Sequence, residues 1–107
     1  MSYIRKFPDR PGYSEDITLE FKAGTFMIRW YLYDEYFPGF EDHEYIIDNI
    51  PDTLFREAFG LKSSRAIQVF LVKFFRHDIS ARRFTELLDN NHIPYTVIPD
   101  DEWVPGW

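Results

Sequence analysis

The clearest pattern of apolar and polar positions in the chain covers residues 17–33, with the sequence ITLEFKAGTFMIRWYLY. Apolar residues occupy every second position on both sides of a short central segment, KAGT, whose glycine suits a turn. Alternation with a period of two on both arms is typical of antiparallel strands that bury one face. We therefore predict a β-hairpin in which Ile28 and Trp30 enter the core. Its solvent face should carry Met27, Arg29, Tyr31 and Tyr33.

Two later segments carry the start and stop signals of short helices. Pro51 can occupy the first position of a helix over residues 51–59, and Gly60 suits its left-handed end. Ser80 is placed to cap a second helix over residues 81–91, which two asparagines can end in the left-handed conformation. We predict a short helix at each place.

The segment Arg65–Phe75, RAIQVFLVKFF, is apolar at nearly every position, so its periodicity does not separate a buried strand from a buried helix. Two preceding serines could cap a helix, whereas the β-branched residues and three phenylalanines favour a strand. We predict a central strand here and a last short strand at Tyr95–Ile98. Residues 41–49 fit either a helical turn or a short strand.

The resulting order of elements is ββαβαβ, in which the strands at residues 65–75 and 95–98 should form a right-handed parallel crossover. With the antiparallel hairpin this gives a mixed sheet of about four strands with two short helices on one face, a small two-layer α+β sandwich. A chain of 107 residues suits a single domain with one core. Within the domain 1–107, residues 1–16 should form an extended arm and residues 99–107 an acidic-aromatic tail.

The composition excludes several classes of chemistry. The chain contains no cysteine, which excludes disulfides, thiol catalysis and zinc sites built on thiolates. It has no apolar run of about 20 residues, the length that a membrane helix needs. The first residues, MSYIRKFPDRPG, lack the apolar core of a signal peptide, so we expect a cytoplasmic protein without a membrane partner.

Charge is distributed in blocks along the chain, whose net charge is −6. Residues 34–57 carry a net charge of −7, residues 58–83 of +5 and residues 84–107 of −5. The six bases of the second of these blocks are called the basic strip: Lys62, Arg65, Lys73, Arg76, Arg82 and Arg83. Acidic blocks flank the strip, so direct binding of nucleic acid is disfavoured for the chain as a whole and stays open for the strip alone.

Candidate catalytic and metal-ligating groups are sparse. The histidines His43, His77 and His92 have no neighbours at a recognised metal-ligand spacing. His77 and Asp78 precede Ser80, but no glycine-framed turn presents this serine as a nucleophile, and a capping role explains it. The five glycines form no phosphate loop. We expect no catalytic residue, no metal site and no cofactor.

Two clusters instead combine carboxylates, aromatic rings and a Pro-Gly turn: residues 33–44, YDEYFPGFEDHE, and residues 100–107, DDEWVPGW. Aromatic anchors rimmed by charge are typical of protein-binding surfaces. The alternative is that the rings of these clusters fold back onto the core. The predicted partner-binding residues are Tyr33, Asp34, Glu35, Tyr36, Phe37, Phe40, Asp42, Glu44, Trp103 and Trp107.

These motifs identify no family, and charge is the main guide to function. We expect a small acidic inhibitor, like an immunity or anti-defence protein, that blocks a basic surface of a nuclease or another nucleic-acid-handling partner. One alternative is a nucleic-acid contact module that uses the basic strip, because the run Lys73–Arg76 interleaves charge with aromatic stacking surface. Another is a small enzyme or ligand-binding domain with an unrecognised site. The sequence leaves self-association open.

Overall fold

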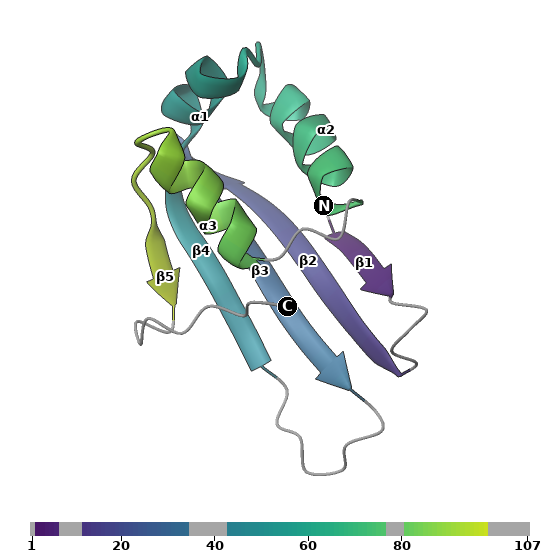
Figure 1. Cartoon of the computed structure of the whole chain (residues 1–107). Helices are drawn as coiled ribbons and strands as arrows, with labels where there is room; N and C mark the ends of the chain where they lie inside the picture. The colour runs from purple at the N-terminus through teal and green to yellow at the C-terminus, as the bar shows by residue number, and fades with distance from the viewer. Residues whose placement is uncertain (1, 7–11, 35–42, 77–80, 99–107) are drawn as a thin grey trace.

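The computed structural model of the chain describes residues 2–6, 12–34, 43–76 and 81–98. Strands β1 to β4 come first, followed by helices α1 to α3 and a short strand β5 (Figure 1). Their bounds are β1 Ser2–Lys6, β2 Tyr13–Lys22, β3 Thr25–Asp34, β4 His43–Pro51, α1 Asp52–Phe59, α2 Ser64–Phe75, α3 Ala81–Asn90 and β5 Thr96–Ile98.

The strands form one sheet in which each strand pairs antiparallel with the next along the chain, in the order β1-β2-β3-β4-β5. The three helices cover one face of this sheet (Figure 1). The predicted two-layer α+β architecture is therefore confirmed. The mixed sheet and the order ββαβαβ are wrong, because every described strand pair is antiparallel and the helices follow one another without a strand between them.

The predicted hairpin is confirmed and is longer than expected. Pairing runs from Lys22 opposite Thr25 to Tyr13 opposite Asp34, and the turn uses Gly24 at φ +79°. Only glycine takes this conformation without steric cost, which is why the turn fixes the register here.

Among the described side chains of β3, the second arm of the hairpin, burial follows the predicted alternation with one exception. Ile28 and Trp30 are fully buried, whereas Tyr31 and the side chain of Arg29 are 38% and 39% exposed. Met27 was expected on the solvent face but is only 5% exposed. It lies opposite an irregularity in the neighbouring strand.

That irregularity is a β-bulge in β4. Phe26 pairs with Ile50 and Ile28 with Ile47, so two residues of β4 face Met27 alone. One of them, Asn49, has φ +56° and belongs to the bulge. Ile47 and Ile50 consequently both point into the core, although their spacing breaks simple alternation. The bulge explains why residues 41–49 showed no clear strand pattern in the sequence.

The prediction of a central strand at residues 65–75 is wrong, because this segment is the helix α2. The hydroxyl of Ser63 accepts a hydrogen bond from the Ala66 backbone N–H at 3.1 Å and caps the helix. Ile67, Leu71 and Phe75, four residues apart, form its buried stripe. Packing of this stripe on the sheet overrides the weak strand preference of the β-branched residues. The predicted parallel crossover is wrong for the same reason.

The other two helices agree with the sequence. α1 begins directly after Pro51 and ends at Gly60, whose φ of +66° is left-handed as expected. α3 ends at Asn90, but the left-handed residue that follows is His92, at φ +56°, rather than an asparagine. The proposed cap Ser80 lies outside the described residues. Within these ranges, no helix is long and apolar enough to cross a membrane.

A single aromatic core lies between the sheet and the helices. The Trp30 ring of β3 contacts Phe75 of α2 at 5.6 Å and Phe84 of α3 at 6.2 Å between centroids. Phe55 of α1 meets Phe26 of β3 edge-on at 5.1 Å. The core therefore ties the sheet to each helix and leaves the other face of the sheet without a helix.

Candidate functional site

The outer face of the sheet, opposite the helices, carries an acidic row. Register places Asp16 of β2 opposite Tyr31 of β3, and Tyr31 opposite Glu44 of β4. Residues paired in this way lie on the same face of a sheet. The register therefore places the ring of Tyr31 between the carboxylates of Asp16 and Glu44. Tyr31 and Glu44 are also exposed to solvent. We call Asp16, Tyr31 and Glu44 the acidic row.

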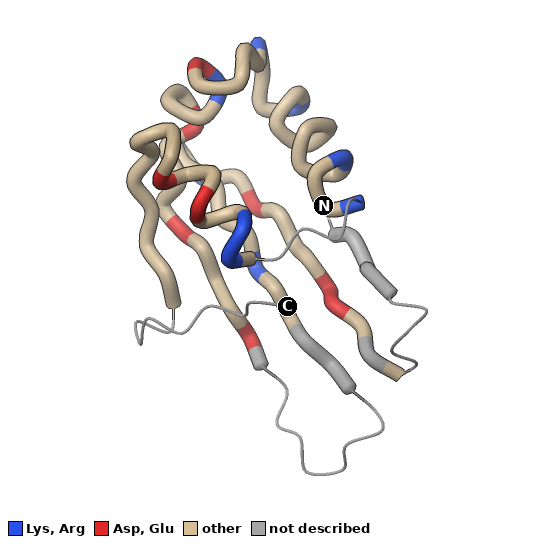
Figure 2. The backbone as a smooth tube through the Cα atoms, viewed as in Figure 1, with Lys and Arg blue, Asp and Glu red and all other residues tan. Residues whose placement is uncertain are grey.

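Ion pairs on the same face leave it with an excess of acid. Lys22 Nζ lies 3.1 Å from Asp48 Oδ1, and Arg29 Nε lies 3.7 Å from Glu44 Oε1. Lys22 and Arg29, the cations of this face whose side chains the structure describes, are thus paired, while the acidic side chains of Asp16 and Glu20 remain in addition. The charges of the strands are seen in Figure 2. The outer face consequently attracts cations.

The described strands place the end of β3, the start of β4 and the end of β5 toward the same end of the sheet. Residues 35–42 connect the end of β3 to the start of β4 at His43. β5 ends at Ile98, which pairs with Ile46, three residues from His43 or about 10 Å along the strand. The end of β5 at Ile98 therefore lies close to the start of β4 at His43.

Most predicted partner-binding side chains lie outside the described residues. These are Tyr33, Asp34, Glu35, Tyr36, Phe37, Phe40, Asp42, Trp103 and Trp107, of which Tyr33 and Asp34 have a described backbone at the end of β3. Glu44 is described and belongs to the acidic row. The sequence analysis did not predict that Asp16 and Tyr31 lie beside Glu44. The turn at Gly24 was the available signal, since it fixes which residues of the hairpin face each other.

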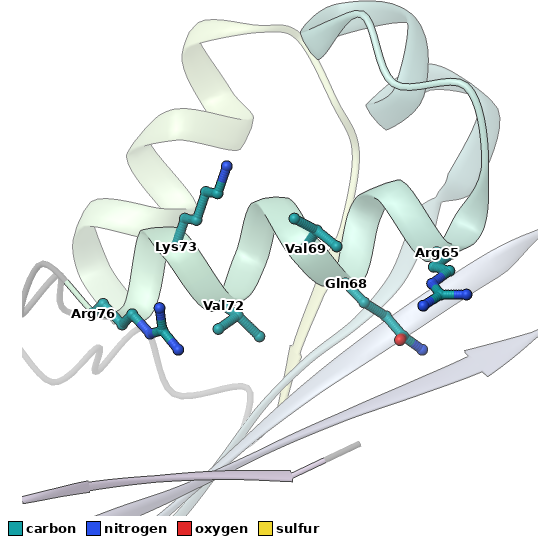
Figure 3. Close-up of a pocket in the computed structure, with 6 residues that line it drawn as sticks. All are labelled: Arg65, Gln68, Val69, Val72, Lys73 and Arg76. Carbon is teal, nitrogen blue, oxygen red and sulfur yellow. The ribbon is translucent and has the colours of Figure 1, made fainter.

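The helical layer presents a second surface, of opposite charge. Six residues on one side of α2 line a hollow of about 380 Å³ (Figure 3). These residues, which we call the α2 basic face, are Arg65, Gln68, Val69, Val72, Lys73 and Arg76. Gln68 and Val72 lie between the two arginines, while Lys73 extends away from them (Figure 3). Val69 is 51% exposed, so the hollow has both apolar and cationic walls.

The cations of the α2 basic face have no counterpart within the described chain. α2 contains no acidic residue, and no ion pair joins Arg65, Lys73 or Arg76 to a described carboxylate. Lys73 and Arg76 are three residues apart, where like charges repel. Near the helix C-terminus they are favoured by the helix dipole, but Arg65 in the first turn is opposed by it.

The aromatic residues between these cations do not form a stacking surface. Phe75 is fully buried against Trp30, and Phe74 packs on Phe84 with ring centroids 5.5 Å apart. The alternative in which charge interleaves with stacking rings at residues 73–76 is therefore not supported by the packing of these two rings. The two rings serve the core, and the charged residues at either end face solvent.

The described residues show little that resembles a reaction centre. They contain no cluster of three or more acidic or histidine side chains that could hold a metal ion. The pKa of Tyr95 is raised to about 12, first because burial disfavours its charged form and then because its hydroxyl donates a hydrogen bond to Asp89 at 2.9 Å. His92 is exposed after α3, whereas the side chains of His43, His77 and Ser80 lie outside the described part.

Comparison with known proteins found no match to this chain among family models, curated proteins or solved structures. Charge, exposure and geometry distinguish two surfaces of the protein, the acidic row on the sheet and the α2 basic face on the helical layer.

Proposed function

We propose that this chain is a small, non-catalytic binding protein that blocks a basic surface of a nuclease or another nucleic-acid-handling protein. The observation that carries the proposal is the acidic row, whose Tyr31 and Glu44 lie on the two strands that residues 35–42 connect. Residues 33–44 and 99–107 would extend this surface beyond the row. A site that binds nucleic acid is cationic because it must contact anionic phosphates. An acidic surface with aromatic anchors is therefore suited to bind and block it.

The acidic row is suited to binding because the sheet holds it in place. Ile17 and Trp30, the buried neighbours of Asp16 and Tyr31, are fully packed in the core. The three residues of the row are thus carried by paired strands rather than by a loop. Little ordering is needed when a partner binds such a surface, which favours affinity.

Glu44 remains available to a partner despite its contact with Arg29. Both side chains are substantially exposed, at 49% and 39%, and their closest atoms are 3.7 Å apart. Exposed pairs of this kind contribute only about 0–1 kcal/mol. A cation of the partner can therefore compete with Arg29 for Glu44 at small cost, while Tyr31 provides apolar contact area.

The test is a differential capture of partners by variants of the tagged, full-length chain in lysate from its native cell. Tyr31→Ala and Glu44→Lys should lose a basic protein that the wild type retains. Glu86→Lys changes an exposed acid on α3, away from the acidic row, and is the matched control. It should retain that protein.

Binding kinetics with the captured protein then separate the roles of ring and charge. Truncating Tyr31 should cost about 2–4 kcal/mol of affinity if it is a central anchor. Glu44→Lys should mainly slow association, and its effect should shrink as salt rises. Wild-type binding by both variants would overturn the proposal.

A further inference from the structure

We propose that the α2 basic face binds the phosphate backbone of a single-stranded nucleic acid. This surface belongs to the helical layer, so it is separate from the acidic row on the outer face of the sheet (Figures 1 and 2). The inference goes beyond the proposed inhibitor function, since it assigns a second ligand to the other side of the molecule. Neither activity depends on the other.

The first argument is that no described carboxylate forms an ion pair with the cations of the α2 basic face. Arg65 stands in the first turn of α2, where the helix dipole opposes a cation. The carboxylate of Asp52 in α1 reaches this turn, but it accepts a hydrogen bond from Ser64 and pairs with Arg56 rather than with Arg65. Intramolecular electrostatics would favour the opposite charge at this position. A bound polyanion removes this unfavourable arrangement.

The second argument is the spacing of the cations. At a rise of about 1.5 Å per residue, Lys73 lies about 12 Å along the helix from Arg65, and Arg76 about 4.5 Å further. One phosphate group cannot reach all three. A nucleic-acid strand carries a phosphate about every 3.4 Å when stacked, so several phosphates can lie along the same length.

The third argument concerns the space between the cations. The hollow of about 380 Å³ falls within the range of small-ligand sites, about 300–1,000 Å³. Val69 and Val72 offer apolar contact there, and the Gln68 amide can both donate and accept hydrogen bonds. A base can enter such a hollow only from an unpaired strand, which favours single-stranded over duplex nucleic acid. Because Phe74 and Phe75 are committed to the core, binding should be led by the backbone and tolerant of sequence.

The test is fluorescence anisotropy of a labelled oligo-dT, titrated with the full-length chain at several salt concentrations. Three phosphate contacts predict a slope of log affinity against log salt of about −2, because each contact on a single strand contributes about −0.7. Affinity should therefore fall about 15- to 20-fold between 50 and 200 mM salt. Arg65→Ala should make the slope shallower by about 0.7, and the double variant K73A/R76A by about 1.4.

Matched variants distinguish this surface from general charge effects. Arg29→Ala removes a cation from the outer sheet face and should leave oligo-dT binding unchanged. Val69→Lys adds a cation at a position that is 51% exposed, and should strengthen binding and steepen the slope by about 0.7. Thermal melts confirm that each variant folds.

Any of the following outcomes would overturn the proposal. One is the absence of salt-dependent binding by the wild type, or equal binding by the wild type and K73A/R76A. Another is tighter binding of duplex than of single-stranded DNA. The third is displacement of oligo-dT by polyglutamate of equal charge at equal concentration, which would assign the surface to an acidic protein.

Discussion

The acidic row and the α2 basic face differ in how their charges are used within the protein. On the outer sheet face, Lys22 and Arg29 each form an ion pair with a carboxylate on β4. On α2, the described residues offer no carboxylate to any of the three cations. Charge on the sheet is therefore partly balanced across strands, whereas the charge on α2 has no ion-pair partner among the described residues.

The two surfaces also share one support, the Trp30 ring, and the largest expected effect comes from removing it. Trp30→Ala leaves a cavity where β3 meets α2 and α3, and should lower the free energy of unfolding by about 3–5 kcal/mol. Urea denaturation gives this value. The neighbouring exposed residue provides the comparison, since Tyr31→Ala should change stability by less than about 0.5 kcal/mol.

Trp30→Phe refines this experiment. The indole N–H of Trp30 is buried and has no hydrogen-bond partner among the described residues. An unsatisfied buried donor costs about 1–3 kcal/mol, so its removal offsets part of the lost contact area. The phenylalanine variant should therefore be much more stable than the alanine variant. Equal melting of Trp30→Ala and Tyr31→Ala would contradict the register of the hairpin.

A smaller change in stability, a gain rather than a loss, is expected from a substitution in the α2 basic face. Arg65→Glu replaces a cation that the helix dipole opposes with an anion that the dipole favours, and should stabilise the protein by about 0.3–1 kcal/mol. The same variant should lose affinity for oligo-dT. Thermal melts and anisotropy on one preparation measure both changes. Loss of stability together with loss of binding would show instead that Arg65 supports the fold.

The smallest effect lies in the pH dependence of a region that belongs to neither surface. The folded state raises the pKa of Tyr95 from 10.0 to about 12, so it holds the phenolic proton more tightly than the unfolded chain does. The resulting stabilisation is complete below pH 10 and is lost as pH rises towards 12. Because the group is partly exposed, it should contribute less than about 1 kcal/mol.

Comparison with Tyr95→Phe isolates this contribution from other groups that titrate at high pH. The difference in unfolding free energy between wild type and variant should be constant below pH 10 and should shrink above it. Urea denaturation at several pH values between 8 and 12 measures it. A difference that does not change with pH would show that the hydrogen bond to Asp89 does not perturb the tyrosine.

The sequence predicted the hairpin but not the helix because the two segments carry different amounts of information. Alternation and a glycine turn predict the hairpin at residues 17–33 and its buried face, except at Met27, which lies opposite the bulge. In residues 65–75 the buried stripe and the partly buried Phe70 and Phe74 make both periods apolar. Only tertiary packing decides between them. Because residues 65–75 were wrongly predicted to form a strand, the parallel crossover predicted from that strand was wrong as well.

The candidate site, like the fold, was predictable only in part. The acidic excess of residues 34–57 and the exposure of Tyr31 follow from sequence, and the acidic row adds the strand register to them. The α2 basic face was not predictable, because its residues share one side only when the segment is helical. The bulge at Asn49 was hidden as well, since asparagine permits a left-handed conformation without requiring it.

The most direct test of the account maps the bound partner onto the chain. Amide chemical shifts of the ¹⁵N-labelled protein are followed while the captured basic protein is added. The account predicts that the largest changes occur at Asp16, Tyr31 and Glu44, with little change across residues 65–76. Changes concentrated in α2, with the acidic row unaffected, would contradict the assignment of the acidic sheet face as the partner-binding surface.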